Sequence, residues 1–367
     1  MRNYEKQEAT FSRKPVIIEC IPNVSTSSEL VVSNIQKAIK QVDGCQLLHT
    51  DTGVAANRTV FTYAGSPLAV YKATQLLYEI ADYEIDMRQH KGVHPRIGAV
   101  DVCPFVPLQG ISIEDCVKLC DQLAQWVWDK LKIPVYCYHY AARTQDRFSL
   151  ANIRKGNYEA LSEKIKLPHW KPDFGEAVFN PTFGATTMGV RDLMLAYNIN
   201  LKHASIGQAN KIAGQVRETG IASAQTGTKQ AGIFKGVKAM GWYLKDLDLV
   251  QVTTNIMDIK SVSAIALFNK IKELAVAENI QVAGSELIGM APLMALEIKN
   301  NAATIDKDVA HVVNYLGLNQ LSPFKPFERI IELALGLANS SKENAWRLTK
   351  PGLLLLLNIF SSASAPW

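Results

Sequence analysis

The chain has 367 residues, of which 48% are hydrophobic and 20% charged, and its net charge is +5. This length allows two domains with separate cores. Lys and Arg are spread along the whole chain, which argues against a dedicated nucleic-acid binder with its concentrated basic stripe. The apolar run 353–357 is too short to span a bilayer, and residues 1–15 lack the apolar core of a secretory signal. We therefore expect a cytoplasmic protein with no membrane partner.

The six cysteines form no CxxC pair and no Cys/His pair at zinc spacing. The seven histidines are equally scattered, without an HxH or HExxH motif. We expect reduced, mostly buried thiols and no metal cofactor.

In the first part of the chain, apolar stripes at helical spacing alternate with short β-rich runs. Thr26-Ser-Ser-Glu29 predicts a capping box, and Ser66-Pro67 and Ser112 predict two further helix starts. The expected helices carry apolar stripes over 30–39, 70–81 and 117–131, and the expected strands are 45–50, 59–64 and 134–140.

Residues 173–189 are rich in Gly, Pro and Thr and predict an ordered connector, within which 184–189 is expected to be a tight turn. The alternation then resumes. The expected strands are 195–201, 237–243, 250–256 and 281–284, and the expected helices are 205–218, 262–277, 303–315 and 326–338. Both blocks have β-α-β-β-α-β character. We predict an α+β protein of two layered α/β subdomains with mixed sheets, ferredoxin-like character and a ligand cleft between them.

Residues 90–101 contain two histidines, an arginine and an aspartate, interspersed with two glycines and a proline. A helix cannot run through this punctuation, so we expect a turn that leads into a strand. Pro95 biases His94 towards extended backbone, which restrains the imidazole. An imidazole held beside Arg96 and Asp101 suits proton transfer on an anionic substrate. On chemistry alone, His94 and His90 both qualify, and each could instead be structural.

A second polar loop, 51–59, also leads directly into an expected strand. It carries Asp51, Asn57 and Arg58. Two such loops in one sheet can converge on a common cleft, although an ordinary turn is the alternative.

Lys229, Lys235 and Lys238 form a loose basic cluster in the second block. It is either a solvated loop or, where it faces the cleft, a site that attracts a polyanionic tail.

Many short motifs follow one another in a fixed order between residues 16 and 337. They include Ile18-Glu-Cys-Ile-Pro-Asn23, Asn57-Arg-Thr-Val60, His94-Pro-Arg96, Ala141-Ala-Arg-Thr144, Ala196-Tyr-Asn-Ile-Asn200, Gly284-Ser-Glu-Leu-Ile-Gly289 and Pro323-Phe-Lys-Pro326. In these motifs the sequence resembles the glutamate formiminotransferases, the folate-dependent enzymes of histidine breakdown. The resemblance implies transfer of a formimino group from N-formimino-L-glutamate to N5 of tetrahydrofolate, with tetrahydrofolate, in mono- or polyglutamylated form, as co-substrate.

The resemblance also implies roles for residues. His94 takes the position of the catalytic histidine. Residue type alone suggests Asp101 or Asp51 as the carboxylate that orients it. Arg58 and Arg96 are the candidates for the substrate carboxylates because guanidinium pairs with carboxylate bidentately, and Asn57 and Asn23 are further candidate substrate contacts. The expected folate contacts are Gly175, Glu176, Ala177, Val178, Phe179, Asn180, Pro181, Thr182, Phe183, Gly184, Lys235 and Lys238.

Four segments are expected on this basis: a flexible extension 1–15, an N-terminal subdomain 16–190, a C-terminal subdomain 191–337, and a tail 338–367. The tail resembles the approach to the cyclodeaminase domain that many relatives carry, cut short; a natural single-function tail is the alternative. A homodimer or higher homo-oligomer is expected.

Some residues depart from the family pattern. Val93 stands where a polar residue often precedes the catalytic histidine, and Ile233-Phe-Lys235-Gly236 is less basic than usual. The less basic loop predicts weaker binding of the glutamate tail of folate. Two rival functions stay open: formyl exchange between 5-formyltetrahydrofolate and glutamate on the same site, and a folate-binding scaffold with weakened catalysis, which the departures would explain.

Overall fold

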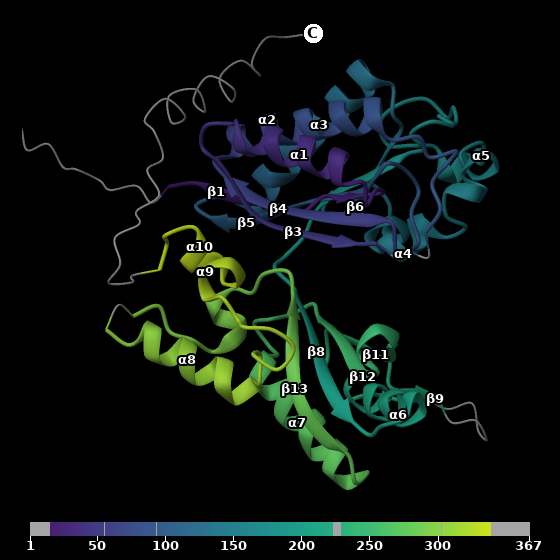
Figure 1. Ribbon diagram of the computed structural model, residues 1–367. Coiled ribbons are helices and arrows are strands. Elements are labelled where there is room, and N and C mark those ends of the chain that lie inside the picture. Colours follow the sequence, from purple (N-terminus) through teal and green to yellow (C-terminus); the bar gives the residue numbers. More distant parts are fainter. Residues whose placement is uncertain (1–14, 55, 93, 223–228, 302, 339–367) are drawn as a thin grey trace, which may run out of the picture.

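The computed structural model describes residues 15–54, 56–92, 94–222, 229–301 and 303–338. The predicted extension and tail lie outside these residues, apart from Pro15 and Ala338. The chain forms two β-sheets, each covered by helices, in two subdomains (Figure 1). The prediction of an α+β fold with two subdomains is confirmed.

The N-terminal subdomain is built on one mixed sheet whose strands run β3–β4–β1/β2–β5–β7–β6. The pairs are antiparallel as far as β5, and β7 is parallel to both β5 and β6. The strands are β1 (Ile17–Cys20), β2 (Asn23–Val24), β3 (Cys45–Gly53), β4 (Arg58–Gly65), β5 (Val100–Gln109), β6 (Val135–His139) and β7 (Thr186–Val190). One face is covered by α1 (Glu29–Lys40), α2 (Pro67–Glu84) and α3 (Ile113–Leu131), which enclose the core (Figure 1).

Two of the three predicted helix starts are confirmed. The hydroxyl oxygen of Ser66 accepts from Ala69 N–H at 3.3 Å, and that of Ser112 accepts from Asp115 N–H at 3.0 Å. The capping box at Thr26 is wrong. The helix begins at Glu29 with Ser28 as its N-cap, so Thr26 lies too early and accepts from Ser28 N–H instead, at 3.1 Å.

The prediction of an ordered connector at 173–189 is only partly correct. Its last residues enter the buried strand β7, so the predicted tight turn at 184–189 is wrong. The segment between β6 and β7 also contains two unexpected short helices, α4 (Leu150–Arg154) and α5 (Leu161–Lys164). Their apolar side chains pack on Tyr136 and Tyr138, which point away from α1–α3, so they cover the other face of the sheet at this edge.

The C-terminal subdomain has a four-stranded antiparallel sheet in the order β11–β12–β8–β13. Its strands are β8 (Leu195–Lys202), β11 (Val237–Leu244), β12 (Leu249–Ile256) and β13 (Gln281–Ile288). The helices α6 (Ile206–Val216) and α7 (Ala264–Ala277) pack on one face and α8 (Ile305–Leu316) follows, while β9 (Ile221–Ala222) and β10 (Lys229–Gln230) form a small separate ribbon.

The helix expected at 326–338 is broken into α9 (Pro326–Arg329) and α10 (Ile331–Ala334). Ile330 between them has an extended backbone (φ −116°, ψ 120°) and forms a parallel bridge with Ala291. This bridge takes the backbone groups that a continuous helix would use.

Both subdomains arrange their β-α-β-β-α-β units identically. The order β3–β4–β1/β2–β5 in the first matches β11–β12–β8–β13 in the second, strand for strand. The ferredoxin-like character is therefore present twice.

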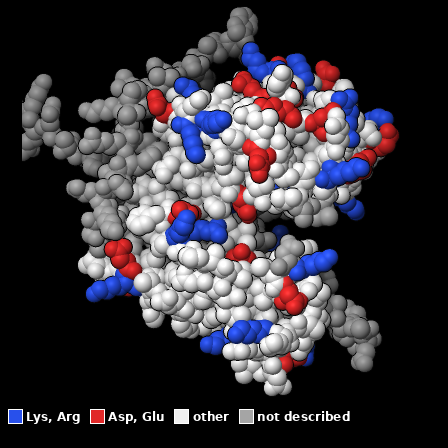
Figure 2. Space-filling view, viewed as in Figure 1, with Lys and Arg blue, Asp and Glu red and all other residues white. Residues whose placement is uncertain are grey.

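The subdomains touch through α9 and α10. Ile17 and Ala64 of the first sheet pack against Ile331 and Leu335, and Gln46 donates from Nε2 to the carbonyl of Ala334 at 3.0 Å. On the other side, at the right of Figure 2, the surface is hollowed between the subdomains.

Candidate functional site

His94 lies on the loop between α2 and β5 and is half-buried. Its Nδ1 lies 2.7 Å from the carbonyl oxygen of Pro95. A carbonyl oxygen only accepts, so Nδ1 carries the proton and donates it to this bond. The other ring nitrogen, Nε2, is left with a free lone pair, as a general base requires.

The charges around His94 favour this neutral form. Burial lowers the pKa of His94 below its usual 6.5, and the positive charges of Arg58 and Arg154 lower it further. The Asp101 carboxylate and the bond to Pro95 act in the opposite direction more weakly than burial and Arg58 together. At neutral pH the imidazole is therefore ready to accept a proton.

His90 has no free ring nitrogen. Its Nδ1 accepts from Arg96 Nε–H at 3.1 Å, and its Nε2–H donates to the carbonyl oxygen of Asn57 at 2.8 Å. Of the two histidines that sequence chemistry left in competition, His94 is the one with a nitrogen available for a substrate.

Arg96 is buried and fully engaged. Its two terminal nitrogens donate to Glu159 at 3.1 and 2.7 Å, and its Nε donates to His90. The Asn57 side chain is engaged too: its oxygen accepts from both N–H and O–H of Ser27 at 2.9 Å, and its amide donates to the Lys91 carbonyl. These contacts fasten neighbouring loops together, and Arg96 could bind a substrate carboxylate only after releasing Glu159.

Arg58, at the start of β4, is the exception among these arginines. Its Nε is buried and has no hydrogen-bond partner among the described residues. Burial lowers the pKa of Arg58 to about 10, and the charge of Arg154 contributes, so the guanidinium still stays protonated at neutral pH. A buried cation with a free donor is costly unless an anion completes it.

The two candidate carboxylates differ in their surroundings. Asp101 is buried and is bound by Arg154 and by the backbone N–H of Ile97, at 3.0 Å. Asp51 is exposed on β3, where its charge acts on Arg58 and His49. Asp101 acts on His94 through its charge, since the ring nitrogen Nδ1 is taken by Pro95. Asn23 is buried in β2, and its amide donates to the Ile21 carbonyl.

The stretch 175–184 packs directly on the loop that carries His94. Ala99 N–H donates to the Phe183 carbonyl at 2.8 Å, and Ala185 N–H donates to the Ile97 carbonyl at 3.0 Å. Side chains are excluded here: a Cβ on Gly98 would lie 2.1 Å from the Ala185 oxygen, and one on Gly184 would lie 2.2 Å from the Ile97 oxygen. The predicted folate stretch and the predicted catalytic loop are therefore neighbours.

Lys235 and Lys238 are exposed in the C-terminal subdomain, and the charge of Lys238 acts on His139 of the first subdomain. Burial lowers the pKa of His139, and the charge of Lys238 adds to this effect. Lys238 is thus close to the end of β6 across the junction between the subdomains.

Sequence reasoning missed Arg154 and Glu159. Both lie in the segment between β6 and β7, for which no helix was expected. No motif marks them, because their importance comes from partners 53 and 63 residues away in the chain.

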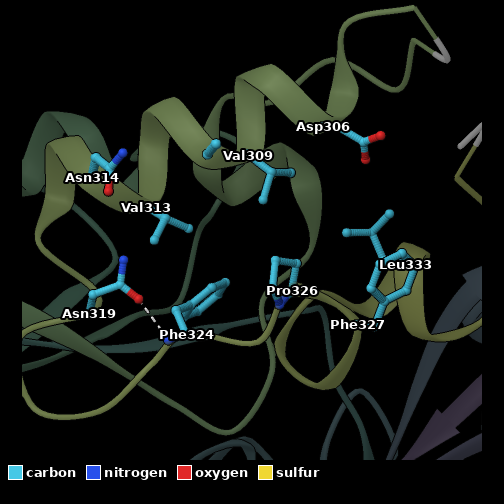
Figure 3. A pocket seen from close by; sticks show the side chains of 10 residues that line it. Asp306, Val309, Val313, Asn314, Asn319, Phe324, Pro326, Phe327 and Leu333 are labelled. Atoms are coloured by element: carbon cyan, nitrogen blue, oxygen red, sulfur yellow. Dashed lines mark hydrogen bonds between the residues drawn. The ribbon is translucent and has the colours of Figure 1, made fainter.

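Other hollows offer less chemistry. The groove of about 270 Å³ between α8 and residues 319–333 is lined by apolar and amide side chains with Asp306 as its one charged group (Figure 3). Within the described ranges, no group of three or more His, Cys, Asp or Glu side chains could hold a metal ion. None of the helices in the described part of the chain has the length and hydropathy that crossing a membrane requires.

The chain is similar to known proteins along most of its described length. A family model described as the formiminotransferase domain, N-terminal subdomain, matches residues 17–191, and one described as the formiminotransferase domain matches residues 196–336. A mouse formimidoyltransferase-cyclodeaminase is 42% identical over 86% of this chain, and the chain spans 59% of that relative's length.

Two shorter relatives match nearly end to end. The glutamate formimidoyltransferase of Streptococcus pyogenes is 37% identical over 76% of this chain and 90% of its own length. That of Thermoplasma acidophilum is 35% identical over 88% of this chain and 99% of its own length.

Proposed function

Because the chain belongs to the formiminotransferase domain family, we propose that it transfers the formimino group of N-formimino-L-glutamate to N5 of tetrahydrofolate and releases L-glutamate. The observation that carries the proposal is a neutral imidazole within electrostatic reach of Arg58, whose buried Nε has no hydrogen-bond partner among the described residues. One group moves a proton; the other binds an anionic substrate.

The reaction begins when N5 of tetrahydrofolate attacks the formimino carbon. A new carbon–nitrogen bond forms, and the tetrahedral adduct carries a positive charge on N5. His94 Nε2 takes the N5 proton and then delivers a proton to the glutamate nitrogen, so that the bond from that nitrogen to the carbon breaks and L-glutamate leaves. The lowered pKa of His94 supports the first step, since the ring must start neutral.

Arg58 is the proposed partner of a carboxylate of formiminoglutamate. A bound carboxylate supplies the acceptor that its buried Nε lacks. The stretch 175–184 is the proposed folate contact, because it packs against the His94 loop, and Lys235 and Lys238 are proposed to attract a polyglutamate tail from the second subdomain.

A donor comparison tests the proposal. The purified chain is given tetrahydrofolate with formiminoglutamate, and L-glutamate release is measured; a parallel reaction offers 5-formyltetrahydrofolate with glutamate. We expect tetrahydrofolate-dependent glutamate release in the first reaction. Turnover only in the second would establish formyl exchange instead, and folate binding without turnover in either would establish a scaffold.

The proposed setting is histidine degradation and one-carbon metabolism in the cytoplasm, with a homodimer or higher homo-oligomer as the assembled form. Light scattering on the purified chain determines the mass of that assembly.

A further inference from the structure

Beside the site lies a buried ion pair that the proposed reaction does not use. Arg154, at the end of α4, binds the Asp101 carboxylate through two nitrogens, Nη2 and Nε. The Asp101 side chain is 1% exposed and that of Arg154 16%. A two-point contact of this kind fixes both side chains in one orientation.

Asp101 passes this constraint to the backbone around His94. The carboxylate oxygen Oδ1 accepts from Ile97 N–H at 3.0 Å, three residues after His94. The carbonyl of Asp101 accepts from the Thr187 hydroxyl at 2.7 Å, which anchors the aspartate to β7. Arg154 thus fixes the Asp101 carboxylate, and Asp101 in turn fixes the backbone of the His94 loop.

The ion pair also determines which cation stays free. Asp101 is the strongest source of negative charge acting on Arg58, and Arg154 repels Arg58. The Asp101 carboxylate is turned towards Arg154, and the Nε of Arg58 remains without a partner among the described residues.

We propose that Arg154 is a positioning residue of the active site: by binding Asp101 it fixes the His94 loop and keeps Arg58 free for the substrate carboxylate. The proposal rests on the proposed function for the identity of that substrate. Arg154 itself need not touch either substrate.

The groups that face His94 come from three elements and its own loop. They are Arg58 on β4, Arg154 on α4, Asp101 on β5 and the carbonyl of Pro95. Removing Arg154 takes away a cation and leaves Asp101 uncompensated, and both changes favour the charged imidazole. The acidic limb of the kcat/KM profile, which reports the free enzyme, should therefore move to higher pH.

The test uses Arg154→Gln, Arg154→Lys and the double variant Asp101→Asn with Arg154→Gln. For Arg154→Gln we expect KM for formiminoglutamate to rise about tenfold or more and the acidic limb to move up by about one pH unit. Arg154→Lys keeps the charge but not the two-point contact. Its acidic limb should therefore stay at the wild-type pH, and its KM for formiminoglutamate should rise less than in Arg154→Gln. The double variant removes both charges and should bring the limb back towards the wild-type position.

Arg147→Gln is the matched control. Arg147 forms another buried ion pair of the same segment, with Asp173, at 6% and 5% exposure, and has no part in the pKa of His94. This variant should lower the melting temperature without moving the acidic limb. An unmoved limb in Arg154→Gln, or an equal shift in Arg147→Gln, overturns the proposal.

An NMR titration of the His94 ring separates this proposal from the proposed function, since it needs no turnover. His94→Gln assigns the signal. If the wild-type chain releases no glutamate, the proposed function fails, whereas a raised His94 pKa in Arg154→Gln still supports the positioning role and an unchanged pKa refutes it.

Discussion

The two subdomains share one strand order but differ in what they place on the sheet face turned away from their main helices. In the first, Phe61 and Tyr63 point to the helices, so Arg58 on the same strand points to the other face. In the second, Tyr197 and Ile199 point to the helices, so Asn198 and Asn200 point away from them.

On that face of the second subdomain, amide side chains hydrogen-bond to one another, and Gln251 also donates to the Glu286 carboxylate at 3.3 Å. Gln251 donates to Asn200 Oδ1 at 2.7 Å, Asn200 donates to Gln320, and Asn198 donates to Gln251 at 3.4 Å. The same face of the first subdomain carries Arg58, whose buried Nε lacks a hydrogen-bond partner among the described residues. Both subdomains have the same fold, and we expect reactivity where that fold leaves polar groups without hydrogen-bond partners.

The largest expected effect comes from His94. We expect His94→Ala to keep the fold and to slow glutamate release by about 10²- to 10⁴-fold, the usual contribution of a positioned acid–base group. His311→Ala, an exposed histidine of the second subdomain, is the control and should be unchanged. Near-normal turnover in His94→Ala would refute the mechanism.

Arg58 should show opposite effects on binding and on stability. Arg58→Met removes the proposed carboxylate partner, so KM for formiminoglutamate should rise by about 30-fold or more, equal to about 2 kcal/mol. The same change removes a buried unpaired donor, so the free energy of unfolding should increase by about 1 kcal/mol. Urea titration measures the second effect. A destabilised variant with normal KM would show that Arg58 is structural.

Replacing Glu19 tests whether a neutral amide stabilises this face of the first subdomain, as amides do in the second. Glu19 is 1% exposed, and burial raises its pKa from 4.5 to about 7, with Arg191 opposing and Glu332 adding to the shift. Between these two values the folded state binds the extra proton, so stability falls as pH rises from 4.5 to about 7 and stays low above it.

Glu19→Gln should therefore increase the free energy of unfolding at pH 8 by about 1–3 kcal/mol and leave it nearly unchanged at pH 4.5. Denaturation at both pH values checks this. Equal effects at the two pH values would contradict the raised pKa.

The amide network should matter for stability alone. Gln251→Leu removes the hydrogen bonds that Asn198 and Asn200 make with Gln251, although each amide keeps one other partner, and should lower the free energy of unfolding by about 1–2 kcal/mol. The pH profile of kcat/KM should keep its shape. A moved acidic limb would show that the second face takes part in the chemistry.

The smallest effect is expected at Lys238. Lys238→Gln should weaken binding of polyglutamyl tetrahydrofolate by less than about tenfold, more at low salt than at high salt, since the charge is exposed. Monoglutamyl folate should bind unchanged. Equal weakening of both forms would place Lys238 near the ring system instead of the tail.

The sequence was informative where periodicity and punctuation act locally. Ser66-Pro67 predicted the start of α2, and the alternating blocks predicted both sheets, because caps and apolar spacing are short-range signals. Strand β7 escaped prediction, since a Gly- and Thr-rich strand buried between two others lacks alternation.

The site residues also divide into those with a local sequence signal and those defined by contacts between distant parts of the chain. The residues around His94 made it a candidate together with His90, and the family resemblance favoured His94. The role of Arg154 depends on a contact with Asp101, and the engagement of Arg96 on one with Glu159, and neither spacing carries a local signal. The restraint of His94 by its adjacent proline carbonyl, in place of a carboxylate, also required the three-dimensional structure.

Chemical rescue tests most directly that His94 is the group that moves the proton. Glutamate release from formiminoglutamate by His94→Ala is measured with and without added imidazole, at a pH where imidazole is neutral. The account predicts a slow basal rate that rises with imidazole concentration and still requires tetrahydrofolate. A variant that already turns over like the wild type, or a slow one that imidazole leaves unchanged, would contradict it.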